Sequence, residues 1–264
     1  MSTAAIVIPC FNEAKRLDRA AFERFAAETP EVSYVFVDDG SVDDTKRMLE
    51  ELAARLSDRA SVVALEKNSG KAEAVRRGVN RALERQPSYV GFWDADLATP
   101  LDVIQKFSGL LDAHPQIQMI MGARVQLLGR RIERSALRHY AGRLSATAIS
   151  TVLGLRVYDT QCGAKLFRSD AARDLFGEPF RTRWIFDAEI IARLIAKLGV
   201  HSDPAARDAV YEYPLHAWMD VRGSKVGPSD YLRAAVDLLR IGGRGVAMAI
   251  STSRKGMATA TIVR

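Results

Sequence analysis

The sequence lacks several features that would assign it to common classes of protein. Its two cysteines, Cys10 and Cys162, form neither a disulfide framework nor a metal-ligand spacing, which indicates a reducing compartment. No apolar run of about 18 or more residues is present, and the N-terminus has no charged segment followed by an apolar one. We therefore expect a cytoplasmic protein, either soluble or attached peripherally to the inner face of a membrane. A GxGxxG after the first predicted strand is also missing, which argues against a dehydrogenase.

The composition is that of a globular protein with a basic surface. The 264 residues are 48% hydrophobic and 27% charged, enough for one large domain or two small ones with an ample core. The net charge of +6 favours anionic partners, such as nucleotides, phosphorylated lipids, a membrane surface or nucleic acid.

Short apolar runs alternate with amphipathic stretches along most of the chain. This alternation predicts a parallel, doubly wound sheet with helices on both faces. Strands are expected at 4–8, 32–37, 61–65, 89–93, 118–122 and 209–214, and helices at 17–28, 43–56, 71–85, 100–114, 135–155, 183–198 and 229–241.

The stretch 89–100 organises the predicted site. Its apolar run reads as a buried strand that ends on Asp94 and Asp96. Ligands of open α/β sheets bind outside the carboxyl ends of the strands, so two carboxylates here can share one divalent cation. Taken alone, the two acids are equally consistent with helix caps or solvated turn residues.

A second charged feature is a basic segment between residues 124 and 143. Arginine matches phosphate in bidentate fashion, so the segment is a candidate phosphate-binding surface. A solvated helix face and a nonspecific RNA-binding patch are the alternatives. The cationic side chains are Arg124, Arg130, Arg131, Arg134, Arg138, His139 and Arg143, with only Glu133 opposing them.

Several short motifs follow one another along the chain. They are 9–13 (PCFNE), 37–41 (VDDGS), 68–71 (NSGK), 94–96 (DAD), 159–168, 186–189 (FDAE) and 223–226 (GSKV). In this order they resemble the family 2 glycosyltransferases of GT-A fold, most of all the dolichyl-phosphate β-glucosyltransferases, with the polyprenyl-phosphate mannosyltransferases nearby. The resemblance spans roughly residues 4 to 241 and implies one catalytic domain at 1–241. The nucleotide-binding half would be about 1–100, the acceptor half about 101–241, and 242–264 a loosely ordered tail.

The resemblance implies an inverting, metal-dependent transfer of a hexose to a polyprenyl phosphate. UDP-glucose is the expected donor, with GDP-mannose second, and Mg²⁺ or Mn²⁺ the expected cofactor. A non-lipid acceptor and a non-catalytic, basic binding protein are the alternatives, while a nucleotidyltransferase would need a Gly-rich, Lys-containing loop that is absent. No nucleic-acid partner is expected, and a homodimer is allowed.

The resemblance also assigns roles to residues. Asp96 would be the direct metal ligand, with Asp94 nearer the ribose or reaching the metal through water, and Ala98 stands where related mannosyltransferases have a third contact. The donor would be bound by Pro9, Phe11, Glu13, Asp38, Asp39, Lys71, Asp94, Lys165 and Lys225. Arg168 could balance phosphate charge, and the acceptor phosphate would meet Arg124, Arg130, Arg131 and Arg134.

The acceptor decides whether a general base is needed. A hydroxyl must lose a proton as it attacks, whereas a phosphate is already anionic and needs only cations around it. We expect a phosphate, with Asp159 orienting it or acting as base. Asp187 and Glu189 are second candidates, although acids in a first helical turn also complement the helix dipole.

Overall fold

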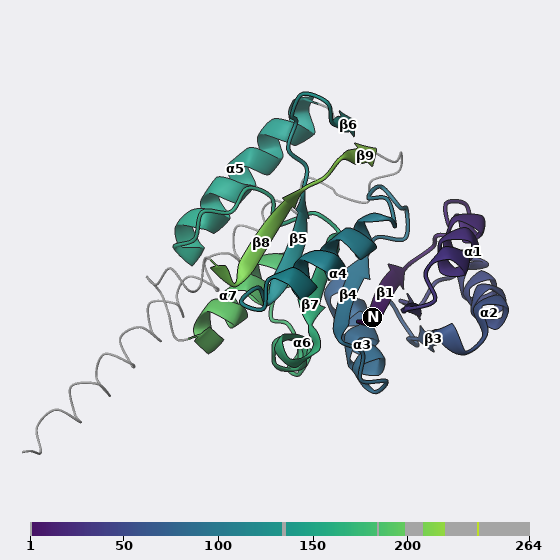
Figure 1. The fold of residues 1–264 in the computed structure, drawn as a ribbon. Helices are drawn as coiled ribbons and strands as arrows, with labels where there is room; N and C mark the ends of the chain where they lie inside the picture. Colours follow the sequence, from purple (N-terminus) through teal and green to yellow (C-terminus); the bar gives the residue numbers. More distant parts are fainter. Residues whose placement is uncertain (1, 134–135, 184, 199–207, 220–236, 238–264) are drawn as a thin grey trace, which may run out of the picture.

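Strands and helices alternate through the chain (Figure 1). The computed structural model describes residues 2–133, 136–183, 185–198, 208–219 and 237. The strands are β1 (Ala4–Cys10), β2 (Val32–Asp38), β3 (Ala60–Ala64), β4 (Tyr89–Trp93), β5 (Met119–Ala123), β6 (Arg131–Glu133), β7 (Ala164–Arg168), β8 (Val210–Pro214) and β9 (Ala217–Met219). The helices are α1 (Arg19–Glu28), α2 (Thr45–Leu56), α3 (Lys71–Leu83), α4 (Val103–Ala113), α5 (Ala136–Leu153), α6 (Ser169–Phe176) and α7 (Phe186–Leu198), with a 3-10 turn, η1 (Ser57–Arg59).

The described residues form one seven-stranded sheet in the order β3-β2-β1-β4-β7-β5-β8 and a small β6–β9 pair. β7 runs antiparallel to both neighbours, and the other paired strands of the large sheet are parallel. The predicted doubly wound, mostly parallel sheet is therefore confirmed, and the strand expected at 209–214 is β8, at one edge of the sheet. β7 was not predicted, because its five residues follow a polar turn and contain Lys165 and Arg168.

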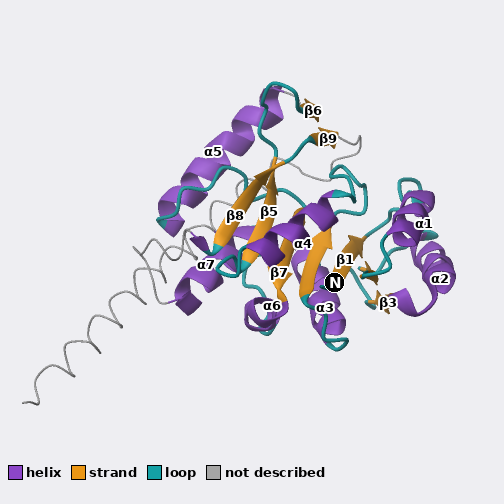
Figure 2. Ribbon diagram, in the orientation of Figure 1, coloured by secondary structure: helices purple, strands orange, loops and turns teal. Residues whose placement is uncertain are grey.

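Helices cover both faces of the sheet (Figure 2). Successive residues of a strand point to opposite faces, so Ile6 and Ile8 pack with α1, α2 and α4, whereas Ala5 and Val7 pack with α3, α5, α6 and α7. Burial of these two apolar layers supplies the main driving force for folding.

Helix α3 lies unusually close to the sheet. A Cβ on Gly78 would come within 2.2 Å of Val7 Cγ1 and 2.8 Å of Val37 Cγ2, so only glycine allows this approach. The close contact fixes the start of α3, where Lys71 lies, relative to the ends of β1 and β2.

Parts of the prediction fall outside the described residues. These are the helix at 229–241 apart from residue 237, the tail at 242–264, Arg134 and Lys225. Among the described residues, no helix is both long and apolar enough to cross a bilayer.

Candidate active site

The candidate site lies at the carboxyl edge of the sheet, which we define as the edge where β1, β2, β4 and β5 end. These strands end at Cys10, Asp38, Trp93 and Ala123, and antiparallel β7 begins beside them at Ala164. Most of the predicted polar residues are therefore brought to one edge, although they come from distant parts of the sequence.

The loops after β1 and β2 are joined to each other at this edge. The backbone amide of Asn12 donates to Ser41 Oγ at 3.0 Å, and that of Glu13 donates to Thr45 Oγ1 at 2.7 Å. The Glu13 carboxylate in turn accepts from Arg16 Nε at 2.8 Å. Pro9, near the end of β1, and Phe11, in the loop after it, are also predicted to bind the donor and are half-buried.

Asp38 and Asp39 hold the loop after β2. Asp38 Oδ1 accepts from the Ser41 amide at 3.2 Å, and the two oxygens of Asp39 accept from the amides of Ser69 and Gly70 at 2.7 and 2.9 Å. Burial raises the pKa of Asp39, although these amides and a nearby guanidinium, that of Arg183, favour its charged form. Both carboxyl groups are buried, so their first role is to fix the loops around the site.

The same region contains Arg183, which the sequence reading did not single out. Its Nε and Nη2 atoms lie 3.2 Å from the position that a Cβ on Gly70 would take. Arg183 comes from the loop between α6 and α7, so the second half of the chain contributes an exposed cation beside the predicted nucleotide residues. No local pattern distinguishes this arginine from its neighbour Arg181.

Asp94 and Lys71 form an ion pair at the carboxyl edge. Lys71 Nζ lies 2.5 Å from Asp94 Oδ1, and both side chains are about two-fifths exposed, at 40% and 38%. The Asp94 backbone amide donates to the Gly163 carbonyl at 2.9 Å, which ties the end of β4 to the residue before β7. The predicted donor residue Lys71 and metal residue Asp94 are thus direct neighbours.

Asp96 is half-buried two residues further on. Its Oδ1 accepts from the Ala98 amide at 3.1 Å. Burial and the Asp94 carboxylate raise the pKa of Asp96, while the Ala98 amide and the charges of Lys71 and Arg16 act in the opposite direction. The raised pKa is the expected result of burial together with a neighbouring carboxylate.

The carboxylates of Asp94 and Asp96 are ligands of the type that a hard divalent cation takes, and two of them would leave other coordination positions of the cation free. Within the described ranges, no group of three or more His, Cys, Asp or Glu side chains is placed to hold a metal. Two carboxylates, completed by water and phosphate oxygens, are a common magnesium arrangement.

Lys165 and Asp187 form a second, fully buried ion pair. Lys165 Nζ lies 2.5 Å from Asp187 Oδ1 and 2.6 Å from the Cys162 carbonyl, and Lys165 is 0% exposed. The ammonium groups of Lys165 and Lys71 lie 5.2 and 5.9 Å from the centroid of the Phe92 ring. Lys165 therefore lies behind the site, and it could contact a donor phosphate only if its pair with Asp187 opened.

Arg124 and Asp159 are joined by a bidentate ion pair. Arg124 Nε and Nη2 donate to Asp159 Oδ2 and Oδ1 at 2.6 and 2.7 Å, and the Arg124 backbone amide donates to Oδ2 at 3.1 Å. The guanidinium also lies 5.2 Å from the ring centroid of Trp218. A predicted acceptor-binding residue and a predicted catalytic residue thus form one unit.

Glu212 supports this unit from β8 and was missed by the sequence reading. Its carboxylate accepts from the backbone amides of Tyr158 and Asp159, each at 2.8 Å. Burial raises the pKa of Glu212. The one signal in the sequence was an acid between two tyrosines in an edge strand. The two-residue periodicity of a strand alone would place the side chain of this acid in solvent.

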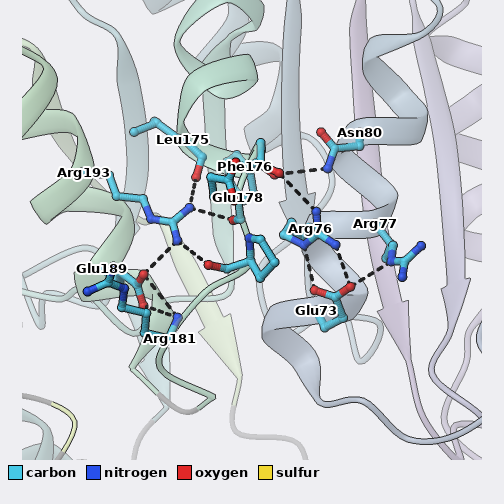
Figure 3. A network of polar contacts seen from close by, with 12 residues as sticks. Glu73, Arg76, Arg77, Asn80, Leu175, Phe176, Glu178, Arg181, Glu189 and Arg193 are labelled. Carbon is cyan, nitrogen blue, oxygen red and sulfur yellow. Dashed lines mark hydrogen bonds and ion pairs between the residues drawn. The ribbon is translucent and has the colours of Figure 1, made fainter. Parts of the chain in front are cut away.

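Glu189 forms hydrogen bonds with the loop that precedes α7 (Figure 3). Its Oε2 accepts from the backbone amides of Arg181 and Thr182 and from Thr182 Oγ1, at 3.0, 3.1 and 3.0 Å. Its Oε1 accepts from Arg193 Nη2 at 2.8 Å. This geometry suits a residue that positions the loop leading to Arg183 better than one that takes a proton.

The model of the family "Glycosyl transferase family 2" matches residues 5–176, which include the ends of β1, β2 and β4 and the start of β7. The chain belongs to glycosyl transferase family 2. It is therefore a glycosyltransferase, as the motifs predicted.

Relatives of this transferase cover most of its length. A dolichyl-phosphate beta-glucosyltransferase of Homo sapiens is 33% identical over 254 residues, which cover 90% of this chain and 74% of that protein. One from Trichomonas vaginalis is 32% identical over 248 residues, 89% of this chain and 69% of that protein. The fold is similar to that of glucosyl-3-phosphoglycerate synthase from Mycobacterium tuberculosis solved with Mn²⁺, UDP and glucosyl-3-phosphoglycerate, with a TM-score of 0.60, 19% identity, and coverage of 95% and 79% of the two chains.

Arg168 lies at the opposite end of the sheet from Arg130 and Arg131 in this family 2 transferase. Arg130 and Arg131 are exposed in and after the loop that leaves β5 at the carboxyl edge. The suggestion that Arg168 could balance phosphate charge is wrong, because Arg168 pairs with Tyr89 at the opposite end of β4 and donates to the Ile117 carbonyl at 2.8 Å. An antiparallel strand reverses which of its ends reaches the site, and the sequence reading had not placed a strand there.

Proposed function

We propose that this transferase moves a hexose from a nucleotide-sugar donor, UDP-glucose first and GDP-mannose second, to a polyprenyl phosphate. The observation that carries the proposal is the cluster of Asp94, Asp96 and Lys71 at the carboxyl edge, next to the loops of Asp38 and Asp39. The dolichyl-phosphate beta-glucosyltransferase relatives support the choice of sugar and acceptor.

Asp96, with Asp94, would hold the divalent cation, Mg²⁺ or Mn²⁺. When bound, such a cation acts as a Lewis acid that stabilises the leaving nucleoside diphosphate. Lys71 would place a further positive charge beside the diphosphate. Pro9, near the end of β1, and Phe11 and Glu13, in the loop after it, would line the nucleotide beside Asp38 and Asp39.

The acceptor step needs little proton chemistry if the acceptor is a phosphate. An acceptor phosphate oxygen attacks the anomeric carbon, the bond from that carbon to the donor diphosphate breaks, and the nucleoside diphosphate leaves with inversion. The attacking oxygen is already anionic, so the protein must reduce repulsion between two anions. Arg130 and Arg131 are exposed and would supply positive charge for this step, and Asp159 would act by orienting Arg124.

The experiment that tests the donor site is calorimetry with UDP-glucose and GDP-mannose, with and without Mn²⁺. We expect one donor to bind in a metal-dependent manner to the wild type and to lose this binding in Asp96→Asn. Asp102→Asn is the matched control, because Asp102 is an exposed carboxylate paired with Lys106 at the start of α4. A wild type that binds neither donor in the presence of metal would refute the donor site.

The acceptor is tested by transfer of labelled glucose to polyprenyl phosphate in detergent, compared with 3-phosphoglycerate and a free polyprenyl alcohol. Transfer to the lipid phosphate alone is the expected result. Transfer to 3-phosphoglycerate instead would keep the donor site and replace the acceptor with a water-soluble phosphate.

A further inference from the structure

A tight turn projects two leucines into solvent next to two arginines. After β5 ends at Ala123, the chain makes a turn in which the Arg130 amide donates to the Leu127 carbonyl at 3.1 Å. Leu127 is 49% exposed and Leu128 is 104% exposed. Gly129 has φ +80°, and the space where its Cβ would lie is open, so the tip of the turn stands away from the rest of the protein.

Few large hydrophobic side chains are exposed, and two of them are adjacent at the tip of this turn. Among the described residues, the exposed large hydrophobic side chains are Val42, Leu127, Leu128, Tyr211 and Met219. Met219 belongs to β9, whose partner β6 directly follows the turn, with Glu133 opposite Met219. Single exposed leucines are ordinary on protein surfaces, but adjacent ones on a protruding turn indicate a contact with something apolar.

The positive charges beside the leucines indicate which kind of surface the turn contacts. Arg130 and Arg131 are exposed and immediately follow the leucine tip, which we call the LLGRR turn (127–131). Apolar side chains flanked by cations match the interface of a bilayer that contains anionic lipids, where the leucines enter the acyl boundary and the arginines meet headgroup phosphates. A nucleic-acid surface would use the arginines but give the two leucines nothing to bury against.

The base of the turn is anchored to the candidate site. Arg124, directly after β5, is held by Asp159, and the Arg131 amide donates to the His216 carbonyl at 3.0 Å. Figure 1 shows β6 and β9 together at one extremity of the molecule, beyond the ends of β5 and β8. A bilayer that receives the turn would therefore lie close to the carboxyl edge, where the proposed acceptor phosphate must arrive.

We propose that the LLGRR turn docks this transferase on an anionic membrane surface by inserting Leu127 and Leu128. The site of docking rests on the structure of the turn, and its purpose, delivery of a lipid phosphate to the carboxyl edge, rests on the proposed function. Because the contact combines apolar insertion with charge attraction, neither component alone gives full binding.

The test is flotation of the full chain with vesicles of phosphatidylcholine and phosphatidylglycerol, compared with phosphatidylcholine alone. We expect the wild type to float with the anionic vesicles and the double variant Leu127→Ser/Leu128→Ser to bind about tenfold more weakly. Arg130→Gln/Arg131→Gln should also bind more weakly, and it should lose most of the salt dependence. Val42→Ser is the matched control, because Val42 is 90% exposed in the loop before α2, and its binding should equal that of the wild type.

Three results would overturn the inference. The first is that the wild type does not float with anionic vesicles, and the second is that the leucine double variant floats as well as the wild type. The third is that RNA displaces the protein from the vesicles to the same extent in the wild type and in the leucine double variant. UDP binding by the leucine double variant separates the two proposals. A variant that binds UDP normally but no vesicles supports the docking turn, whereas vesicle binding by a wild type that binds no donor supports the turn and refutes the donor site.

Discussion

Lys71 Nζ lies 2.5 Å from Asp94 Oδ1, so an ammonium group neutralises one of the two carboxylates proposed to hold a cation. A divalent ion that approaches Asp94 must compete with this ammonium or displace it. When a nucleotide diphosphate is present, the displaced ammonium gains a new anionic partner. On the proposed function, the pair would therefore link occupancy by metal to occupancy by nucleotide.

We predict that Lys71→Met has opposite effects on the two ligands. Without nucleotide, Mn²⁺ should bind more tightly, by about fivefold at most, because a half-exposed ion pair is worth about 1 kcal/mol or less. With Mn²⁺ present, UDP should bind more weakly. Titration followed by Mn²⁺ paramagnetic resonance measures the first effect and calorimetry the second.

The control for this prediction is Lys67→Met in the same loop. Lys67 is exposed, and its side chain forms no ion pair with the described residues. Weaker Mn²⁺ binding by Lys71→Met in the absence of nucleotide would show that the ammonium does not compete with the metal.

Gly163→Ala should disturb the metal residues through a steric effect. A Cβ on Gly163 would lie 1.8 Å from Asp94 Oδ2, so the carboxylate must leave its position. We expect a loss of about 1–3 kcal/mol in the free energy of unfolding, typical of overpacking, together with weaker Mn²⁺-dependent UDP binding. Gly109→Ala in α4 is the control, because its Cβ would meet nothing within 4 Å and should be neutral or stabilising. Unchanged UDP binding by Gly163→Ala would mean that the position of Asp94 is unimportant for the donor.

Lys165→Met should be strongly destabilising. It leaves the Asp187 carboxylate buried without its ammonium partner, a change that typically costs about 3–5 kcal/mol. The double variant Lys165→Met/Asp187→Asn should recover part of this loss, because it removes the uncompensated charge. Guanidinium denaturation of the four proteins in this cycle gives the coupling energy. Additive effects of the two substitutions would contradict the assignment of a coupled pair.

Glu212→Gln should change how stability depends on pH. Burial raises the pKa of Glu212 above its ordinary value of 4.5, so the folded state binds this proton more tightly than the unfolded state. As the pH rises from 4.5 through the raised pKa, the wild type should therefore lose stability relative to the glutamine variant. Urea denaturation across this range measures the difference. A difference that does not vary with pH would show that Glu212 titrates normally.

The sequence by itself determined the fold class and the family. Alternating apolar runs and amphipathic stretches specify the doubly wound sheet, since a two-residue or 3.6-residue periodicity is a local property of the chain. The sequence also predicted that Asp94 and Asp96 lie at the carboxyl edge, because they follow a buried strand and parallel strands bring their carboxyl ends to one edge.

Only the tertiary structure decided which charges face one another. Lys165 and Asp187 are 22 residues apart, and their pairing depends on how α7 packs against β7. Arg124 and Asp159 are 35 residues apart, and their pairing depends on how the loop before β7 meets the end of β5. The direction of β7 placed Lys165 behind the site and Arg168 at the far end. Glu212 and Arg183 reach the site by the same long-range packing. The exposure of Leu127 and Leu128 was equally hidden, because hydropathy favours burial of a leucine pair, and a tight turn with a glycine at φ +80° keeps both side chains in solvent.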